Sequence, residues 1–266
     1  MRSMNKSRYF PLALEALVEL LPEIEAAEQK ALTYVPTLDE VLGKLGVAPD
    51  GALFLGMASD GLPVLLNIYD PIPGSILITG AEGVGKTNFL KSLASVTIRM
   101  FDPHDLQFGV LTASPQDWAG FEHFEHCATI QPIYENSAMD FLASLNSWAH
   151  SNRSKQSFLL LIDGLDKITS WEKQSINDFR WLAMRGPSRR VWPIASINSN
   201  LLRTADVLTT EFRTIIYGST RAEVIPTTLT KPMQEELDEL NTNNHFLMKE
   251  GNDWLKFWVP RLDQGE

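Results

Sequence analysis

The sequence predicts an α/β fold with three layers, in which helices cover both faces of a mainly parallel β-sheet. Between residues 74 and 225, apolar segments of strand length alternate with amphipathic segments of helical length. A strand that is followed by a helix and another strand normally returns to the same sheet as a parallel neighbour. A glycine-rich segment also stands between the first of these strands and the first of these helices.

The composition excludes several classes of protein. Of the 266 residues, 44% are apolar and 21% charged, a balance that excludes a disordered or fibrous chain. The longest apolar run, Phe158–Ile162, is far shorter than a membrane span, so we expect no membrane association. A single cysteine, Cys127, excludes an internal disulfide and indicates a reducing compartment, the cytoplasm. The net charge of −10 argues against broad attraction to nucleic acid, although a local basic surface is compatible with it.

The chain is expected to divide into four segments. Residues 1–50 form a helical N-terminal extension, and 51–73 form a β-hairpin, because two apolar runs flank Asp60-Gly61. Residues 74–225 form the core. Residues 226–266 form a C-terminal segment with a second hairpin, which turns near Gly251-Asn252.

Apolar periodicity predicts the elements of these segments. In the extension, helices are expected over 9–32 and 38–45. The strands expected in the core are 74–80, 107–114, 128–134, 158–163, 191–198 and 212–218, and the helices are 86–100, 137–150 and 171–184.

The most specific motif is G-A-E-G-V-G-K-T, residues 80–87, which matches the phosphate-binding loop G-x-x-x-x-G-K-[ST] and follows a strand directly. Its glycines let successive N–H groups face phosphate oxygens, and the helix N-terminus adds its positive dipole end. In this role Lys86 reaches the β- and γ-phosphates and the Thr87 hydroxyl is a Mg²⁺ ligand. The motif predicts a P-loop NTPase with a RecA-like sheet and with ATP and Mg²⁺ as cofactors. The residues expected to bind the nucleotide are Gly80, Ala81, Glu82, Gly83, Val84, Gly85, Lys86, Thr87 and Asn88.

The segment SFLLLIDGLDKI, residues 157–168, is typical of a buried strand that ends in a metal-binding aspartate, Asp163. The next residue is Gly164, where an ATPase often has a glutamate that orients the attacking water. Either Asp166 takes this role, or no residue does and the protein binds ATP as a switch or as an assembly clamp. The candidate catalytic residues are therefore Lys86, Asp163 and Asp166. Glu172 is a further acid, but Thr169–Glu172 fits a helix capping box better.

Several segments stand in the order of a known family. LGMASDGLPVLLNIYD runs into GSILITGAEGVGKTNFLKSLA, then come FRWLAMRGPSRRVWPIASIN and the closing NNHFLMKEGNDWLKFWVP. Over roughly residues 51–260 this order resembles the FtsK–HerA group of P-loop motors. The resemblance implies an oligomeric ATPase, with a ring that threads DNA and an arginine that completes the next subunit's ATP site. Arg185, Arg189 and Arg190 are the candidates, and a solvated basic turn is the alternative for each.

This chain departs from the family at two positions. Gly164 stands where the family has glutamate, and the family's sensor glutamine aligns with Ile197, which leaves Ser196 or Asn198 as polar substitutes. The string DGLD also resembles the acidic motif of NACHT-type signalling ATPases, in which a later acid, here Asp166, is catalytic. Those proteins lack the two hairpins expected in this chain.

Two other features carry no site. His123, His126 and Cys127 are too close in sequence to complete a metal site, and the scattered tryptophans indicate core packing. We therefore expect a Mg-ATP-dependent ATPase that acts as an oligomeric, DNA-associated motor. The alternative is a nucleotide-binding switch or adaptor that acts through a protein partner.

Overall fold

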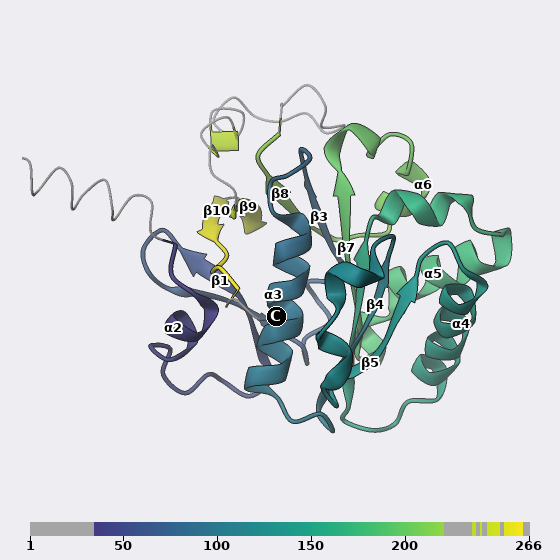
Figure 1. Cartoon of the computed structure of the whole chain (residues 1–266), viewed down its shortest axis with the longest axis horizontal. Coiled ribbons are helices and arrows are strands. Elements are labelled where there is room, and N and C mark those ends of the chain that lie inside the picture. The colour runs from purple at the N-terminus through teal and green to yellow at the C-terminus, as the bar shows by residue number, and fades with distance from the viewer. Residues whose placement is uncertain (1–34, 221–235, 238–239, 241–243, 251–252, 263–266) are drawn as a thin grey trace, which may run out of the picture. The chain divides into compact units, whose positions relative to one another are not determined.

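The computed structural model describes residues 35–220, 236–237, 240, 244–250 and 253–262 (Figure 1). The helix predicted over 9–32 and the turn at 251–252 lie outside these residues. In the part that is described, no helix is long and apolar enough to cross a lipid bilayer.

A sheet of ten strands, counted over the described residues, forms the middle layer, in the order β2-β1-β10-β9-β8-β3-β7-β6-β4-β5. The pairs from β8 to β5 are parallel, as the sequence predicts, and the pairs from β2 to β8 are antiparallel. The two hairpins, which are far apart in the sequence, join through β1 and β10 and extend this sheet. The strands are β1 Ala52–Ala58, β2 Pro63–Asn67, β3 Ile76–Gly80, β4 Leu106–Thr112, β5 Cys127–Pro132, β6 Ser157–Asp163, β7 Val191–Asn198, β8 Thr214–Gly218, β9 His245–Glu250 and β10 Asp253–Trp258.

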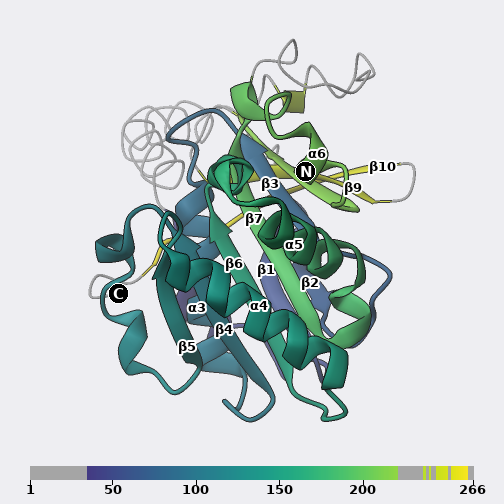
Figure 2. The same ribbon diagram turned by 90° about the vertical axis from the view of Figure 1, so that its right-hand side faces the viewer.

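Helices cover both faces of the sheet. Figure 2 shows α4 and α5 on one face and α3 on the other, which makes the three layers predicted from the sequence. The described α-helices are α2 Leu38–Leu42, α3 Lys86–Met100, α4 Asn136–Ser151, α5 Lys173–Arg185 and α6 Asp206–Thr209. Short 3₁₀ turns are η1 Pro115–Trp118, η2 Phe121–His123, η3 Leu165–Ser170, η4 Pro187–Arg189 and η5 Ser199–Leu201.

Burial on both faces explains the apolar run of β6. Leu159 and Leu161 pack in the core on the α3 side, whereas Phe158 and Leu160 pack in the core under α4 and α5. Because successive side chains of a strand point to opposite faces, a strand covered on both sides needs apolar residues at every position. The run ends at Asp163, which reaches the carboxyl edge of the sheet.

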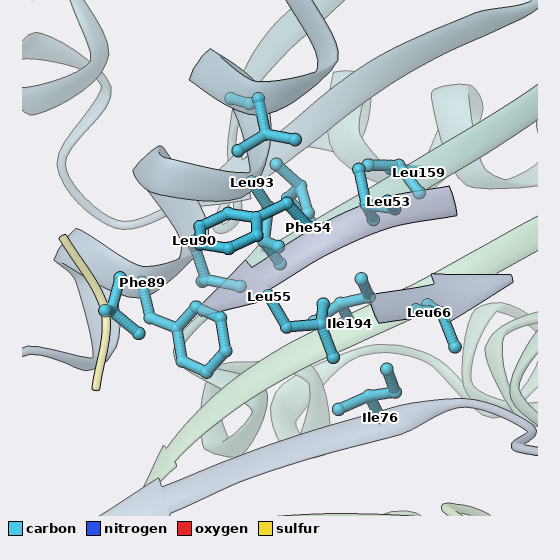
Figure 3. Packing of buried hydrophobic residues seen from close by; sticks show 14 of the residues in the cluster. Leu53, Phe54, Leu55, Leu66, Ile76, Phe89, Leu90, Leu93, Leu159 and Ile194 are labelled. Carbon is cyan, nitrogen blue, oxygen red and sulfur yellow. The ribbon is translucent and has the colours of Figure 1, made fainter. Parts of the chain in front are cut away.

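The helix α3 packs on one face of the sheet, against strands of the first hairpin and of the closing hairpin. Its apolar face, with Phe89, Leu90 and Leu93, contacts the buried side chains of the sheet (Figure 3). The ring of Phe89 lies 4.9 Å from that of Phe246 in β9 and 5.9 Å from that of Phe257 in β10. The closing hairpin therefore holds the helix that begins at the phosphate-binding loop.

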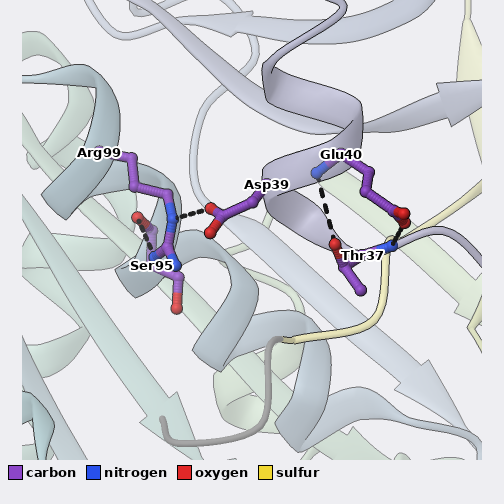
Figure 4. A network of polar contacts seen from close by, with 5 residues as sticks. All are labelled: Thr37, Asp39, Glu40, Ser95 and Arg99. Atoms are coloured by element: carbon purple, nitrogen blue, oxygen red, sulfur yellow. Dashed lines mark hydrogen bonds and ion pairs between the residues drawn. The ribbon is translucent and has the colours of Figure 1, made fainter.

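The helix α2 is shorter than the predicted 38–45, because it ends at Leu42 before Gly43. Thr37 and Glu40 form a capping box at its start (Figure 4). Asp39 forms an ion pair with Arg99 near the end of α3. This ion pair joins α2 to the C-terminal end of α3.

The capping box expected at Thr169–Glu172 is wrong. Thr169 lies inside η3, and its hydroxyl donates to the carbonyl of Asp166 at 2.6 Å. The N-cap of α5 is Glu172, which has the extended backbone that a cap residue needs. The 3₁₀ turn forms because it buries Leu165 and Ile168 completely.

We expect Phe89→Ala to lower the free energy of unfolding by about 3–5 kcal/mol, because the ring fills the space between α3 and the closing hairpin. Urea unfolding followed by fluorescence measures this. Phe89→Leu retains most of the volume and should lose less. Equal stability of the wild type and Phe89→Ala would contradict this packing.

Candidate nucleotide-binding site

The glycine-rich loop crosses from the end of β3 to the start of α3 at the carboxyl edge of the sheet. Gly85 ends the loop with a φ of 92°, in the left-handed region that favours glycine. A Cβ at this position would lie 2.8 Å from Oδ1 of Asn244. Asn244 also donates its backbone N–H to the carbonyl of Val84 at 3.4 Å. The start of the closing hairpin thus braces the loop.

The ammonium group of Lys86 is bound by its own loop. It donates to the carbonyl oxygens of Gly80 at 3.1 Å and Ala81 at 2.6 Å. Burial lowers the pKa of Lys86 to about 8, against the opposing influence of Asp163 and Glu82. Nucleotide phosphates would offer this ammonium a stronger acceptor than two neutral carbonyl groups.

Three elements meet at Asp163. The hydroxyl of Thr87, in the first turn of α3, lies 3.0 Å from each oxygen of the Asp163 carboxylate. The hydroxyl of Ser196 in β7 donates to Oδ1 of Asp163 at 2.8 Å and accepts from the N–H of Gly164 at 3.1 Å. This contact follows from the sheet order, because β7 lies between β3 and β6 and pairs Ser196 directly with Asp163.

The oxygen atoms of Thr87 and Asp163 fit a magnesium ion. Mg²⁺ takes oxygen ligands, commonly one or two carboxylates together with water and nucleotide phosphates. The carboxylate and the hydroxyl already lie side by side at the start of α3, where the phosphates of a nucleotide would come. Ser196 orients the carboxylate from behind.

Gly164 has a backbone conformation that disfavours a second acidic residue directly after Asp163. Its φ is 104°, so a glutamate at this position would be strained. The turn buries Leu165 and brings Asp166 and Lys167 to the site. Nζ of Lys167 lies 2.7 Å from Oδ2 of Asp166, and this hydrogen bond raises the pKa of Lys167.

These groups line one cavity of about 390 Å³. Of the residues predicted to bind the nucleotide, Gly80, Ala81 and Val84 do not line it, because they form the base of the loop. The lining residues are Glu82, Gly83, Gly85, Lys86, Thr87, Asn88, Thr112, Ala113, Ser114, Asp163, Gly164, Asp166, Lys167, Ser196, Ile197 and Asn198.

Sequence reasoning named Ser196 and Asn198 but missed Thr112, Ala113, Ser114 and Lys167. The side chain of Ile197 is buried in the core under α5, so it is Ser196 and Asn198 that bring polar side chains to the cavity. Lys167 directly follows Asp166, and this adjacency was a usable signal. Asn244 carries no signal at all, because its place beside the loop depends on β9.

The three candidate arginines lie at the opposite edge of the sheet. Arg185 and Arg189 are exposed near the amino end of β7, whereas the cavity lies at the carboxyl end. Arg190 donates to the carbonyl of Lys155 at 3.1 Å and stacks 4.7 Å from the centre of the Tyr69 ring. None of the three lines the cavity of its own chain.

Comparison with known proteins identifies the fold. No family model matches the chain, and no curated protein matches it. The structure is similar to EccC (ATPases 2 and 3) of Thermomonospora curvata in complex with a signal sequence peptide, with a TM-score of 0.65 and 12% identity. EssC (ATPases 2 and 3) of Geobacillus thermodenitrificans gives a TM-score of 0.66 and 14% identity. The pCW3 conjugation coupling protein TcpA with ATPγS gives a TM-score of 0.62 and 13% identity.

The overlap extends over most of this chain. It covers 86% of the chain against EccC, 87% against EssC and 86% against TcpA. The chain spans less than half of the EccC and EssC chains, 43% and 45%, and 70% of TcpA. At such low identity the likeness shows the fold, which is that of the FtsK–HerA-type P-loop ATPases. The resemblance stated from the sequence is confirmed at this level.

The affinity for ATP should fall as the pH rises above the Lys86 pKa of about 8. Below that pH the free chain already holds the proton on Lys86. Above it, the bound phosphates must draw a proton from solution, which lowers the affinity by about tenfold per pH unit. Calorimetric titration across pH measures this dependence. Lys86→Arg, which stays charged, should remove it, and a constant wild-type affinity would contradict it.

Replacing Ser196 by alanine should weaken the Mg²⁺-dependent part of ATP binding about tenfold or more, because Asp163 loses the donor that orients it. Dissociation constants with Mg²⁺ and with EDTA separate this effect from general damage, since binding in EDTA should be unchanged. Ser196→Thr keeps the hydroxyl and is the matched control. Equal losses with and without Mg²⁺ would count against this role.

Proposed function

We propose that the chain binds Mg-ATP in this cavity and hydrolyses it to ADP and phosphate, as a subunit of an oligomeric, DNA-associated motor. The observation that carries the proposal is the meeting of the phosphate-binding loop, Lys86 and the Thr87–Asp163 pair in one cavity at the carboxyl edge of the sheet. The same edge is where open α/β sheets bind their ligands.

In this proposal each residue of the loop region has a separate task. Lys86 leaves the carbonyl groups of Gly80 and Ala81 and donates to the β- and γ-phosphates. Thr87 and Asp163 hold Mg²⁺, which when bound neutralises charge that develops on the phosphate oxygens. Ser196 keeps the Asp163 carboxylate in place.

Asp166 is the proposed base. Its carboxylate accepts a proton from the water that attacks the γ-phosphorus, and the bond from this phosphorus to the β–γ bridging oxygen breaks. ADP takes the electron pair of that bond, and phosphate is released. Asp166 lines the cavity and its side chain is 14% exposed, so it is near the reacting water and largely shielded from bulk solvent.

The motor part of the proposal rests on the fold and on the placement of the arginines. TcpA is described as a conjugation coupling protein, and EccC as a type VII secretion ATPase. The exposed Arg185 and Arg189 would complete the cavity of a neighbouring copy of the chain. With a net charge of −10, contact with DNA must use a local basic surface. The proposed location is the cytoplasm, where the single Cys127 stays reduced.

A second function is a nucleotide-binding switch that acts through a protein partner. The observation that favours it is the ion pair between Asp166 and Lys167, which occupies the candidate base. The left-handed backbone at Gly164 also disfavours the usual glutamate at this position. The two functions differ in whether bound ATP is turned over.

Asp166→Asn should lower the rate of ATP hydrolysis about 10²–10⁴-fold without weakening ATP binding, because it removes the proton acceptor and leaves Lys86, Thr87 and Asp163 unchanged. Phosphate release is measured across a series of protein concentrations, with and without double-stranded DNA. Asp140→Asn on the exposed surface of α4 is the control, since Asp140 does not line the cavity.

The same experiment separates the two functions. Turnover that rises with protein concentration or with DNA supports the oligomeric motor. Wild-type chain that binds ATP but shows no hydrolysis under any of these conditions is a switch, and the proposal of a motor then fails.

A further inference from the structure

The cavity holds a second lysine for which the phosphate-binding loop does not account. The charged side chains that line it are Glu82, Lys86, Asp163, Asp166 and Lys167. Lys86 is buried and belongs to the loop, whereas the side chain of Lys167 is 37% exposed and reaches the cavity from η3. We infer that Lys167 binds the γ-phosphate of ATP, and that it leaves Asp166 when it does so. This inference rests on the proposed function of the site.

The present partner of Lys167 is easily replaced. The ion pair joins adjacent residues and its lysine is partly exposed, a kind of pair that contributes little to stability. A terminal phosphate offers several charged oxygen atoms in a confined cavity, where hydrogen bonds between charged groups are stronger. Asp166 raises the pKa of Lys167 and Tyr134 adds to this, so the ammonium stays protonated until the phosphate arrives.

The backbone around Lys167 is already in position for this exchange. The left-handed turn at Gly164 brings η3 over the cavity, and the complete burial of Leu165 and Ile168 anchors that turn in the core. Only the side chain of Lys167 then has to move, and it has four carbon atoms between the backbone and the ammonium group.

The exchange would link the release of Asp166 to the identity of the nucleotide. ATP has a γ-phosphate that can take the Lys167 ammonium, which frees the Asp166 carboxylate. ADP lacks this group, so Asp166 stays paired with Lys167. Lys167 thus becomes a residue that distinguishes ATP from ADP and makes the candidate base accessible only when ATP is bound.

The test is the ratio of ATP affinity to ADP affinity, measured by calorimetry with Mg²⁺ for the full chain. Lys167→Met keeps the length of the side chain and removes the charge, and it should lower this ratio about tenfold by weakening ATP binding alone. Lys167→Arg should retain most of the ratio. Lys173→Met, which changes an exposed lysine outside the cavity, should leave it unchanged.

Three outcomes would overturn the inference. An unchanged ratio in Lys167→Met would mean that Lys167 does not contact the γ-phosphate. Equal weakening of ATP and ADP binding would assign it a general structural role, and Lys167→Arg with the same loss as Lys167→Met would exclude a role of its charge. Wild-type chain that binds neither nucleotide would instead overturn the proposed function, and the inference with it.

Discussion

The carboxylate of Asp163 is the group on which the rest of the site depends. It accepts a hydrogen bond from the hydroxyl of Ser196 at 2.8 Å and lies 3.0 Å from the hydroxyl of Thr87. Residues of β6, β7 and α3 therefore meet at one side chain. Because β7 separates the strand of the phosphate-binding loop from the acidic strand, a short polar side chain is needed between them. Without it, a partly buried carboxylate oxygen would lose a partner. Ser196 fills this position, and through Gly164 it also holds the turn that carries Asp166.

The closing hairpin supports the site from the other side. Phe246 and Phe257 pack on Phe89, one turn into α3, while Asn244 contacts the loop at Val84 and Gly85. The helix and the loop are therefore both held by a segment that lies more than a hundred residues further along the chain. A change in the packing of this hairpin would alter the position of the phosphate-binding loop, because the hairpin contacts α3 and the loop directly.

The two lysines of the cavity lie in opposite electrostatic surroundings. Burial lowers the pKa of Lys86, so the arrival of an anion stabilises its charged form. The pKa of Lys167 is raised by Asp166, so its charge is already compensated. Nucleotide phosphates would thus give the Lys86 ammonium a charged partner. At Lys167 they would compete with Asp166 for the ammonium group. This asymmetry follows from position alone, since Lys86 begins a buried helix and Lys167 lies on a partly exposed 3₁₀ turn.

Short-range sequence signals were sufficient to predict much of the fold of this protein. The loop at 80–87, the helix over 86–100 and the parallel strands of the core follow from short motifs and periodicity, and the structure has each of them. Contacts between distant segments decided the rest: the joining of both hairpins to the sheet, Ser196 beside Asp163, and Asn244 beside the loop. The same holds for Thr169, where burial of the 3₁₀ turn overrides a local capping signal. The physical reason is that backbone preference acts within a few residues, whereas strand order and burial are set by packing partners far away in the chain.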